Sequence, residues 1–152
     1  VGMPTETVYG LAADATNPKA ALSVFAAKGR PADNPLIVHI ARLEDLPAVV
    51  REIPEAAQKL AQAFWPGPLT IIMKKSDAIP MATSAGLDTV AVRCPKTAAT
   101  RELIRLAGVP IAAPSANRSG RSSRPAACPW PPPRRTFPAC QVPPRPSTPF
   151  RT

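Results

Sequence analysis

The sequence predicts an α/β fold built on a mixed sheet. Segments with helical periodicity alternate with short, strand-like apolar runs along the first 120 of its 152 residues. Short turns rich in proline and glycine, such as the one after Lys75, suit antiparallel as well as parallel neighbours. A hydrophobic content of 45% is enough for the core of one domain of this length.

Three helices are predicted, each with a recognisable beginning or end. Asn17 and the proline after it open the first helix, which runs to about Ala27, and Pro54 opens the second. A third helix ends at Gly108 and is capped by the threonine at 97 or at 100. Apolar residues recur at helical spacing in each segment, so each is expected to bury one face. The residues expected on these faces are Leu22, Phe25 and Ala26; Ala57, Leu60, Ala61 and Phe64; and Leu103, Ile104 and Ala107.

Four short apolar runs predict strands. In chain order they are PLIVHIA from Pro35, LTIIMKK, DTVAVRCP and VPIAAPS. The WPGP sequence before the second run is expected to end the preceding helix sharply. The segment Val1–Met3 resembles the end of a further strand, and the chain does not begin with Met. We therefore expect the sequence to be a fragment that is cut short at both ends.

The composition changes near Gly120. Residues 121–152 hold 10 of the 22 prolines, and they carry six arginines and no acidic residue. Proline blocks the interiors of helices and sheets, so this Pro/Arg-rich tail is predicted to be disordered or loosely extended. A docking segment for a proline-recognising domain is one alternative. The interpretation we favour is that a shifted reading frame produced it. The predicted organisation is a domain over 1–120 and a tail over 121–152.

Several classes of protein and of site are not indicated. The chain has no apolar run of 18 residues and no N-terminal signal pattern, which favours a cytoplasmic protein away from membranes. Its three cysteines form no C-x-x-C pair and it has one histidine, so no metal site is predicted. P-loop and G-x-G-x-x-G patterns are missing, and no Ser-His-Asp arrangement is legible. Of the net charge of +9, only +3 lies before residue 121, which permits a nucleotide or RNA partner without requiring one.

Polar stretches at the ends of the predicted elements form the candidate site. They are PTETVYG (Pro4–Gly10), KGRPADNP (Lys28–Pro35), Arg93 at a strand end and PSANRSG (Pro114–Gly120). Ligands of open α/β sheets bind at such edges. Hydroxyls can accept hydrogen bonds from an ammonium, and arginine can clamp a carboxylate at two points. The set suits a small zwitterion and a phosphate-bearing partner, and His39 is expected to face the same pocket.

Each of these groups also has a purely structural explanation. Hydroxyls can stabilise turns, and cations can complement a helix C-terminus. A histidine in a strand can belong to the core, and a strand-end arginine can be a surface cation. The prediction of a site therefore depends on the combination rather than on any single residue.

Taken together, five blocks resemble the YrdC-like family, the threonylcarbamoyl-AMP synthases. PTETVYGL, KGRP..NPL..H, WPGPLT, VAVRCP and PSAN.SG occur in the order and rough spacing of that family. The resemblance covers Val1 to about Gly120. It implies a twisted mixed sheet with flanking helices and a basic concave groove, here incomplete. The family usually continues after PSANRSG with a helix and further strands, where this chain has the proline-rich tail.

The resemblance also implies a reaction. Such enzymes are nucleotidyltransferases that make L-threonylcarbamoyladenylate from L-threonine, bicarbonate or CO2, and ATP, with release of pyrophosphate. Mg2+ is expected with ATP. The product feeds the synthesis of N6-threonylcarbamoyladenosine in tRNA by a downstream threonylcarbamoyl transferase machinery.

Matching the family's motifs position by position assigns site residues. The residues implied to contact threonine are Thr7, His39, Arg93 and Ser115. The residues implied to contact the nucleotide are Arg30, Asn34, Thr89 and Asn117. Lys28 and Arg30 are the candidate catalytic cations beside the phosphates.

Three alternatives remain open at this point. One is the carbamoyl-adenylate-forming domain of a hydrogenase maturation protein. Another is a module that binds double-stranded RNA or tRNA in the same groove without catalysis. The third is a pseudogene product without activity. Because the family's C-terminal part is replaced, we expect this chain to be a poor catalyst even if the domain folds.

Overall fold

The structure is a computed structural model that describes residues 1–29 and 33–116. These residues lie in one compact unit, Val1–Ser119. The predicted domain boundary near Gly120 and the predicted tail over 121–152 lie outside the described residues, so both stay predictions.

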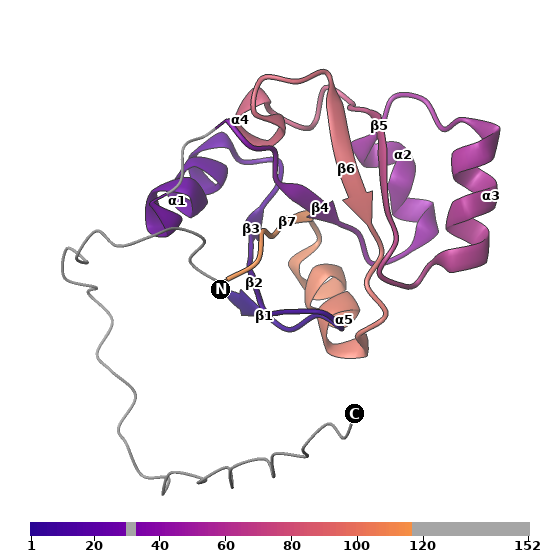
Figure 1. The fold of residues 1–152 in the computed structure, drawn as a ribbon, viewed down its shortest axis with the longest axis horizontal. Coiled ribbons are helices and arrows are strands. Elements are labelled where there is room, and N and C mark those ends of the chain that lie inside the picture. Colours follow the sequence, from indigo (N-terminus) through magenta and orange to yellow (C-terminus); the bar gives the residue numbers. More distant parts are fainter. Residues whose placement is uncertain (30–32, 117–152) are drawn as a thin grey trace, which may run out of the picture. The chain divides into compact units, whose positions relative to one another are not determined.

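A five-stranded mixed sheet forms the centre of this unit (Figure 1). Its strand order is β3-β7-β4-β6-β5; β4 and β6 are parallel, and every other pair is antiparallel. The predicted mixed α/β architecture is thus confirmed. The strands are β3 (Ala13–Asp14), β4 (Ile37–His39), β5 (Thr70–Lys74), β6 (Thr89–Arg93) and β7 (Ile111–Ala112). A small antiparallel sheet pairs β1 (Gly2–Met3) with β2 (Gly10–Leu11).

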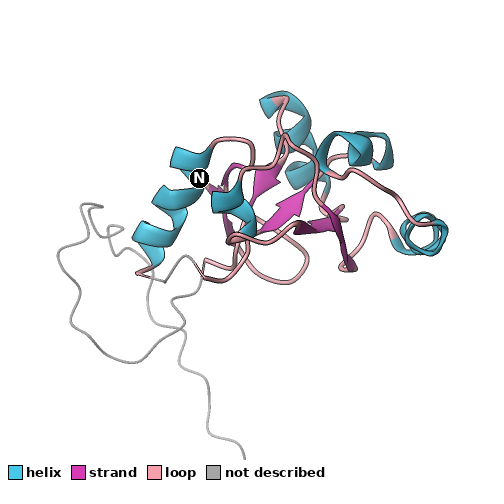
Figure 2. Ribbon diagram, turned by 90° about the horizontal axis from the view of Figure 1, so that it is seen from above, coloured by secondary structure: helices cyan, strands magenta, loops and turns pink. Residues whose placement is uncertain are grey.

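The helices lie above and beside the layer of strands in the view of Figure 2. The three predicted helices are confirmed, and two four-residue helices, too short to show periodicity, accompany them. A 3-10 turn, η1 (Leu43–Asp45), leads into the first of these short helices. The helices are α1 (Pro18–Lys28), α2 (Leu46–Val49), α3 (Glu55–Phe64), α4 (Met81–Ser84) and α5 (Ala98–Ala107). Among the described helices, none has the length and apolarity needed to cross a bilayer.

Local sequence explains where the longer helices begin and end. The Asn17 side chain accepts hydrogen bonds from the backbone N–H groups of Lys19 and Ala20, which caps α1. Gly108 ends α5 with φ of 67°, a conformation that glycine adopts without steric cost. Gly67 in the WPGP turn is also required, because a Cβ there would lie 2.3 Å from the carbonyl oxygen of Phe64.

The predicted inward faces are partly wrong. In α1 the buried residues are Ala21, Val24 and Phe25, whereas Leu22 and Ala26 are exposed. In α3 only the alanines Ala57 and Ala61 are buried; Leu60 and Phe64 are 44% and 59% exposed. In α5 Ile104 is buried, Leu103 half-buried and Ala107 exposed. Periodicity finds an apolar stripe but not which edge of it meets the sheet, and α3 lies at the periphery of the domain (Figure 1).

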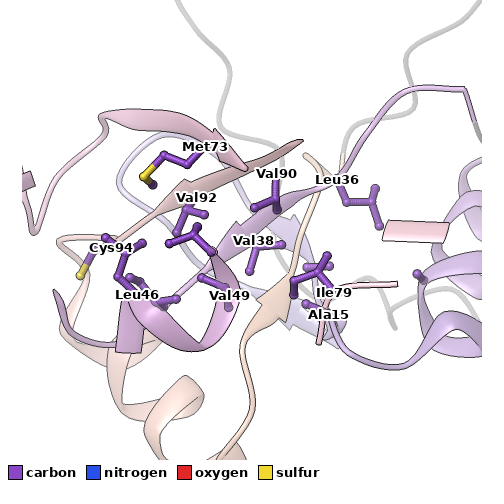
Figure 3. Close-up of a cluster of buried hydrophobic side chains, with 14 of the residues drawn as sticks. Ala15, Leu36, Val38, Leu46, Val49, Met73, Ile79, Val90, Val92 and Cys94 are labelled. Atoms are coloured by element: carbon purple, nitrogen blue, oxygen red, sulfur yellow. The ribbon is translucent and has the colours of Figure 1, made fainter. Parts of the chain in front are cut away.

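The main core lies against one face of the sheet (Figure 3). Val38 of β4, Val90 and Val92 of β6 and Met73 of β5 are all at most 4% exposed. They pack with buried side chains of α1, α2 and α3, Leu46 and Val49 among them. Each fully buried aliphatic side chain of this kind stabilises the fold by about 1.5–3 kcal/mol.

The alternate residues of the same strands form the second face. Thr89 and Ala91 of β6 are half-buried, and Ile72 of β5 is 69% exposed. At one end of this face, Ile111 of β7 packs with Ile104 of α5 in a separate small apolar cluster. The middle of the second face is therefore incompletely covered by the described residues.

Candidate functional site

His39 and Arg93 end the two parallel strands of the sheet and lie side by side. They are register partners in the β4–β6 pair, and Thr70 of β5 is the partner of Arg93 on its other side. Register partners project from the same face of a sheet, so an imidazole, a guanidinium and a hydroxyl share the second face. The sequence prediction that Arg93 and His39 meet at one strand end is consistent with this register.

His39 is a buried, neutral imidazole. Only 2% of its surface is exposed, and its Nδ1 atom has no hydrogen-bond partner among the described residues. Burial, followed by the charge of Arg93, lowers the pKa of His39 from 6.5 to about 4; backbone groups of Ile111 and Ile37 oppose this shift. At neutral pH the ring is uncharged and offers a vacant hydrogen-bonding nitrogen.

Arg93 is a buried cation with unused donors. It is 8% exposed, and its Nη2 atom lies 2.7 Å from Oε1 of Glu6. Neither Nε nor Nη2 makes an aligned hydrogen bond within the described chain, so the contact with Glu6 is an ion pair of poor hydrogen-bond geometry. Buried polar atoms are rarely left unpaired, and those of Arg93 and His39 therefore mark a place for a polar ligand.

Glu6 is a site residue that the sequence analysis missed. It comes from the loop between β1 and β2, and its side chain is 22% exposed. Burial alone would raise the pKa of Glu6, but the close contact with the positively charged Arg93 and nearby backbone N–H groups outweigh it and lower the pKa. The only local signal was one acid among hydroxyls in PTETVYG. Nothing local shows that this acid reaches Arg93.

The loop that carries Glu6 is tied to the rest of the domain. The hydroxyl of Thr100, a buried residue of α5, donates to the carbonyl of Pro4. The backbone N–H of Lys96 lies 3.5 Å from Oε1 of Glu6, at the limit of a hydrogen bond. Of the two threonines predicted as the cap of this helix, Thr97 is at the N-cap position, and Thr100 lies within α5.

The stretch Pro4–Gly10 meets the beginning of Pro114–Gly120. The N–H of Ala116 donates to the carbonyl of Tyr9 over 2.6 Å, and Gly10 forms an isolated bridge with Ser115. A Cβ on Gly10 would lie 3.1 Å from the Cβ of Ala113, which explains a glycine at this crossing. Two of the predicted site stretches are therefore adjacent.

Lys28 brings in a third stretch. Its Nζ atom, at the end of α1, donates to the backbone carbonyl of Ser115. The contact joins residues 87 positions apart in the sequence. All four predicted polar stretches are thus connected. Glu6 of Pro4–Gly10 contacts Arg93. Lys28 of Lys28–Pro35 contacts Ser115 of Pro114–Gly120.

The remaining predicted site residues have different outcomes. Thr7 is exposed, and its hydroxyl lies 3.2 Å from the hydroxyl of Thr5. The Thr5 hydroxyl also accepts a hydrogen bond from the backbone N–H of Val8. Asn34 is exposed, and Thr89 begins β6 on the same face as Arg93, about 13 Å away along the strand. Arg30 and Asn117 lie outside the described residues.

Two cavities have volumes of about 370 and 360 Å3. The first lies between η1, α2 and α5, and the second is lined by Trp65, Cys94 and Arg101. Neither is lined by His39, Arg93 or Glu6. The candidate site is therefore the group of polar atoms at the strand ends rather than either cavity.

The sequence matches the Sua5/YciO/YrdC family, described as "Telomere recombination", over residues 1–128. A threonylcarbamoyl-AMP synthase of Pyrococcus abyssi is 56% identical over 123 residues, which make up 81% of this chain and 36% of that protein. One of Bacillus subtilis is 52% identical over 124 residues, with the same coverage of 81% and 36%. The chain thus spans about a third of the length of these curated relatives.

Solved structures with the same fold include several relatives. Sua5 of P. abyssi complexed with L-threonine is 56% identical with a TM-score of 0.77, covering 80% of this chain and 36% of that one. The MTH1692 protein of Methanobacterium thermoautotrophicum is 30% identical with a TM-score of 0.63, covering 82% and 58%. Full-length HypF is 19% identical with a TM-score of 0.68, covering 80% and 19%, a likeness of fold alone.

Proposed function

Because the chain belongs to the Sua5/YciO/YrdC family, we propose that it is a threonylcarbamoyl-AMP synthase domain. The proposed reaction makes L-threonylcarbamoyladenylate from L-threonine, bicarbonate or CO2, and ATP, and releases pyrophosphate. The relatives from P. abyssi and B. subtilis carry the name of this activity.

One observation carries the proposal. His39 and Arg93 are buried side by side at the ends of two parallel strands, with three polar atoms that have no hydrogen-bond partner among residues 1–29 and 33–116. An amino acid with a carboxylate and a hydroxyl satisfies such a pair. The carboxylate binds the guanidinium of Arg93, and the hydroxyl binds the neutral ring of His39. The P. abyssi protein, 56% identical, has been solved with L-threonine.

The chemistry needs no nucleophile from the protein. The amine of threonine attacks the carbon of CO2, a C–N bond forms, and the amine proton leaves to bicarbonate or water. An oxygen of the resulting carbamate attacks the α-phosphorus of ATP, the bond from that phosphorus to the bridging oxygen breaks, and pyrophosphate leaves. The protein's part is to hold the reactants in line and stabilise charge.

The nucleotide side remains a proposal based on family positions. Lys28 is fixed close to Ser115, so its ammonium lies at the edge of the threonine side. We assign the phosphates to Lys28 and Arg30, and the rest of the nucleotide to Asn34, Thr89 and Asn117. The described residues gather no group of three or more His, Cys, Asp or Glu. Mg2+ entering with ATP would then be held mainly by phosphate oxygens.

The product is proposed to serve tRNA modification in the cytoplasm. A threonylcarbamoyl transferase machinery would transfer the threonylcarbamoyl group to adenosine of tRNA. An RNA-binding module without catalysis would not need to bind threonine, whereas a threonylcarbamoyl-AMP synthase must bind it. Measuring threonine binding therefore distinguishes these two functions.

The test combines calorimetric titration of L-threonine with a pyrophosphate-release assay on the same preparation of the 152-residue chain. The assay contains ATP, Mg2+ and bicarbonate, with and without threonine. We expect threonine to bind and pyrophosphate release to depend on threonine and bicarbonate, at a rate below that of the P. abyssi enzyme. The absence of both threonine binding and threonine-dependent pyrophosphate release would contradict the proposed function.

A further inference from the structure

Glu6 contacts the central residue of the proposed site, yet the proposed chemistry gives it no role. Its carboxylate is the one ion-pair partner of Arg93 within the described chain. The pair is only partly accessible, with side-chain exposures of 10% for Arg93 and 22% for Glu6. A half-buried acid beside a buried arginine at a ligand site is expected to affect which ligand enters.

Arg93 keeps a hydrogen-bond donor, Nε, that its contact with Glu6 does not use. The contact between the two side chains joins Oε1 of Glu6 to Nη2 of Arg93 over 2.7 Å. The Nε atom of Arg93 is buried and has no hydrogen-bond partner in the part of the chain that the structure describes. A guanidinium has five N–H donors, so a ligand carboxylate can bind Arg93 without displacing Glu6.

Charge balance then decides which ligands fit. Arg93 carries +1, Glu6 carries −1 because its pKa is lowered, and His39 is neutral at pH 7. The three groups together are therefore neutral before a ligand binds. A simple carboxylate would give these three groups a net negative charge beside two buried side chains, which is unfavourable. A zwitterion adds no net charge, provided that its ammonium lies near Glu6.

We propose that Glu6 receives the α-ammonium of the ligand and makes this site selective for α-amino acid zwitterions over carboxylate anions. This inference depends on the proposed function, since it takes the ligand carboxylate to lie on Arg93. Glu6 is thus a specificity-determining residue, with Arg93 and Glu6 reading the two opposite charges of one amino acid. Its weak basicity suits holding the amine rather than removing its proton.

The first part of the experiment compares two ligands of the same shape on the unmodified chain. They are L-threonine and (2S,3R)-2,3-dihydroxybutanoate, in which a hydroxyl replaces the ammonium. Calorimetry at pH 7.5 measures both dissociation constants. We expect threonine to bind about 10- to 100-fold more tightly, the range for a hydrogen bond between charged groups. Equal affinity for the two ligands would overturn the inference without any variant.

The second part uses Glu6→Gln, which keeps the shape of the side chain and removes its charge. We expect threonine binding to weaken about 10- to 100-fold and dihydroxybutanoate binding to change less than about threefold or to improve. Glu6→Asp should recover part of the preference for threonine. Glu102→Gln is the matched control, because Glu102 is an exposed acid of α5 paired with Arg105.

The outcomes separate this inference from the proposed function. If the unmodified chain does not bind threonine, the proposed function fails and this inference fails with it. If it binds threonine and Glu6→Gln tightens both ligands equally, Glu6 merely competes for Arg93, and only this inference is overturned. Equal weakening of both ligands assigns Glu6 a structural role and also overturns it. A fall in the ratio of the two affinities, reversed by Glu6→Asp, supports it.

Discussion

The two faces of the central sheet come from the same few strands but differ in almost every property. On the face with the main core, Val38, Val90 and Val92 are nearly inaccessible and pack against helices. On the opposite face the alternate residues other than Ile111 are polar or partly exposed, and the strand ends hold His39 and Arg93. A strand changes side at every residue, so one five-residue segment such as β6 contributes to both.

The difference shows how stability and binding are separated in a small fold. The apolar side chains of the covered face pack against one another and against helices, so they offer no polar group to a ligand. The other face keeps buried polar atoms that have no partner among the described residues, which costs stability and is tolerated where a ligand supplies the partner. Substitutions at neighbouring positions of one strand should therefore have opposite kinds of effect.

The largest effect is expected from introducing a charge into the covered face. Met73 and Ile72 are neighbours on β5, with exposures of 4% and 69%. Met73→Asp buries an unpaired carboxylate and should lower the free energy of unfolding by more than about 4 kcal/mol, whereas Ile72→Asp should change it by less than about 1 kcal/mol. Urea unfolding followed by circular dichroism measures both. Similar losses for the two variants would mean that the faces are not as different as described.

Acid should destabilise the domain through His39. The pKa of His39 is about 4 in the folded chain and 6.5 as an ordinary histidine. The unfolded chain therefore binds a proton first as the pH falls, and the stabilisation is complete above pH 6.5 and lost as the pH falls toward 4. Between pH 6.5 and 5 the loss is about 2 kcal/mol.

Urea midpoints at several pH values above 5 measure this dependence, and His39→Gln supplies the control. The variant should show a flatter dependence over the same interval, because it lacks the titrating ring. This range also keeps clear of Glu6, whose lowered pKa gives a loss of stability only at lower pH, below its ordinary value of 4.5. An unchanged pH dependence in His39→Gln would contradict the burial of a neutral histidine.

Arg93→Lys should affect binding more selectively. A lysine keeps the charge but has no planar fork for a carboxylate. We expect threonine binding to weaken about 10-fold, close to 1.4 kcal/mol, with a smaller change for ATP. Calorimetric titration of each ligand measures the two effects. Equal losses for threonine and ATP would argue against Arg93 as the threonine clamp.

Thr89→Val should have the smallest effect on stability and binding. It tests whether the start of β6 belongs to the partly covered face rather than to the core. Thr89 is half-buried at the start of the strand, so its loss should change the free energy of unfolding by less than about 0.5 kcal/mol. If Thr89 contacts the nucleotide, ATP binding should weaken by about threefold, a typical loss for one hydrogen bond. Unfolding and calorimetry on the same preparation test both. A large loss of stability would show that this end of the strand belongs to the core.

Much of the fold could be predicted from the sequence because local patterns matched the helices and strands of the structure. Two such patterns extend over only a few residues each. They are the apolar runs that form β5 and β6, and the Asn17 cap that begins α1. The buried faces were less predictable, since exposed Leu60 and Phe64 have the same spacing as buried core residues. Their exposure depends on where α3 lies, which no local pattern records.

Site residues were predictable when they belonged to a recognised motif. They were not predictable when their role depends on a contact with a residue far away in the sequence. His39 and Arg93 were expected in one pocket, and their register pairing brings them together. Glu6 was missed because its importance comes from Arg93, far along the chain. Lys28 was expected beside phosphates, but its contact with the carbonyl of Ser115 could not be deduced from a cationic loop alone.

The position of β7 has a consequence for synthesis on the ribosome. This strand comes last in the described chain, yet it lies between β3 and β4. At about 5–20 residues per second, several seconds pass between the emergence of β4 and that of β7. During this interval β3 and β4 expose unpaired edges that other nascent chains can join. Translation speed and chaperone supply over residues 40–112 should therefore influence the yield of folded protein more than the stability of the finished sheet does.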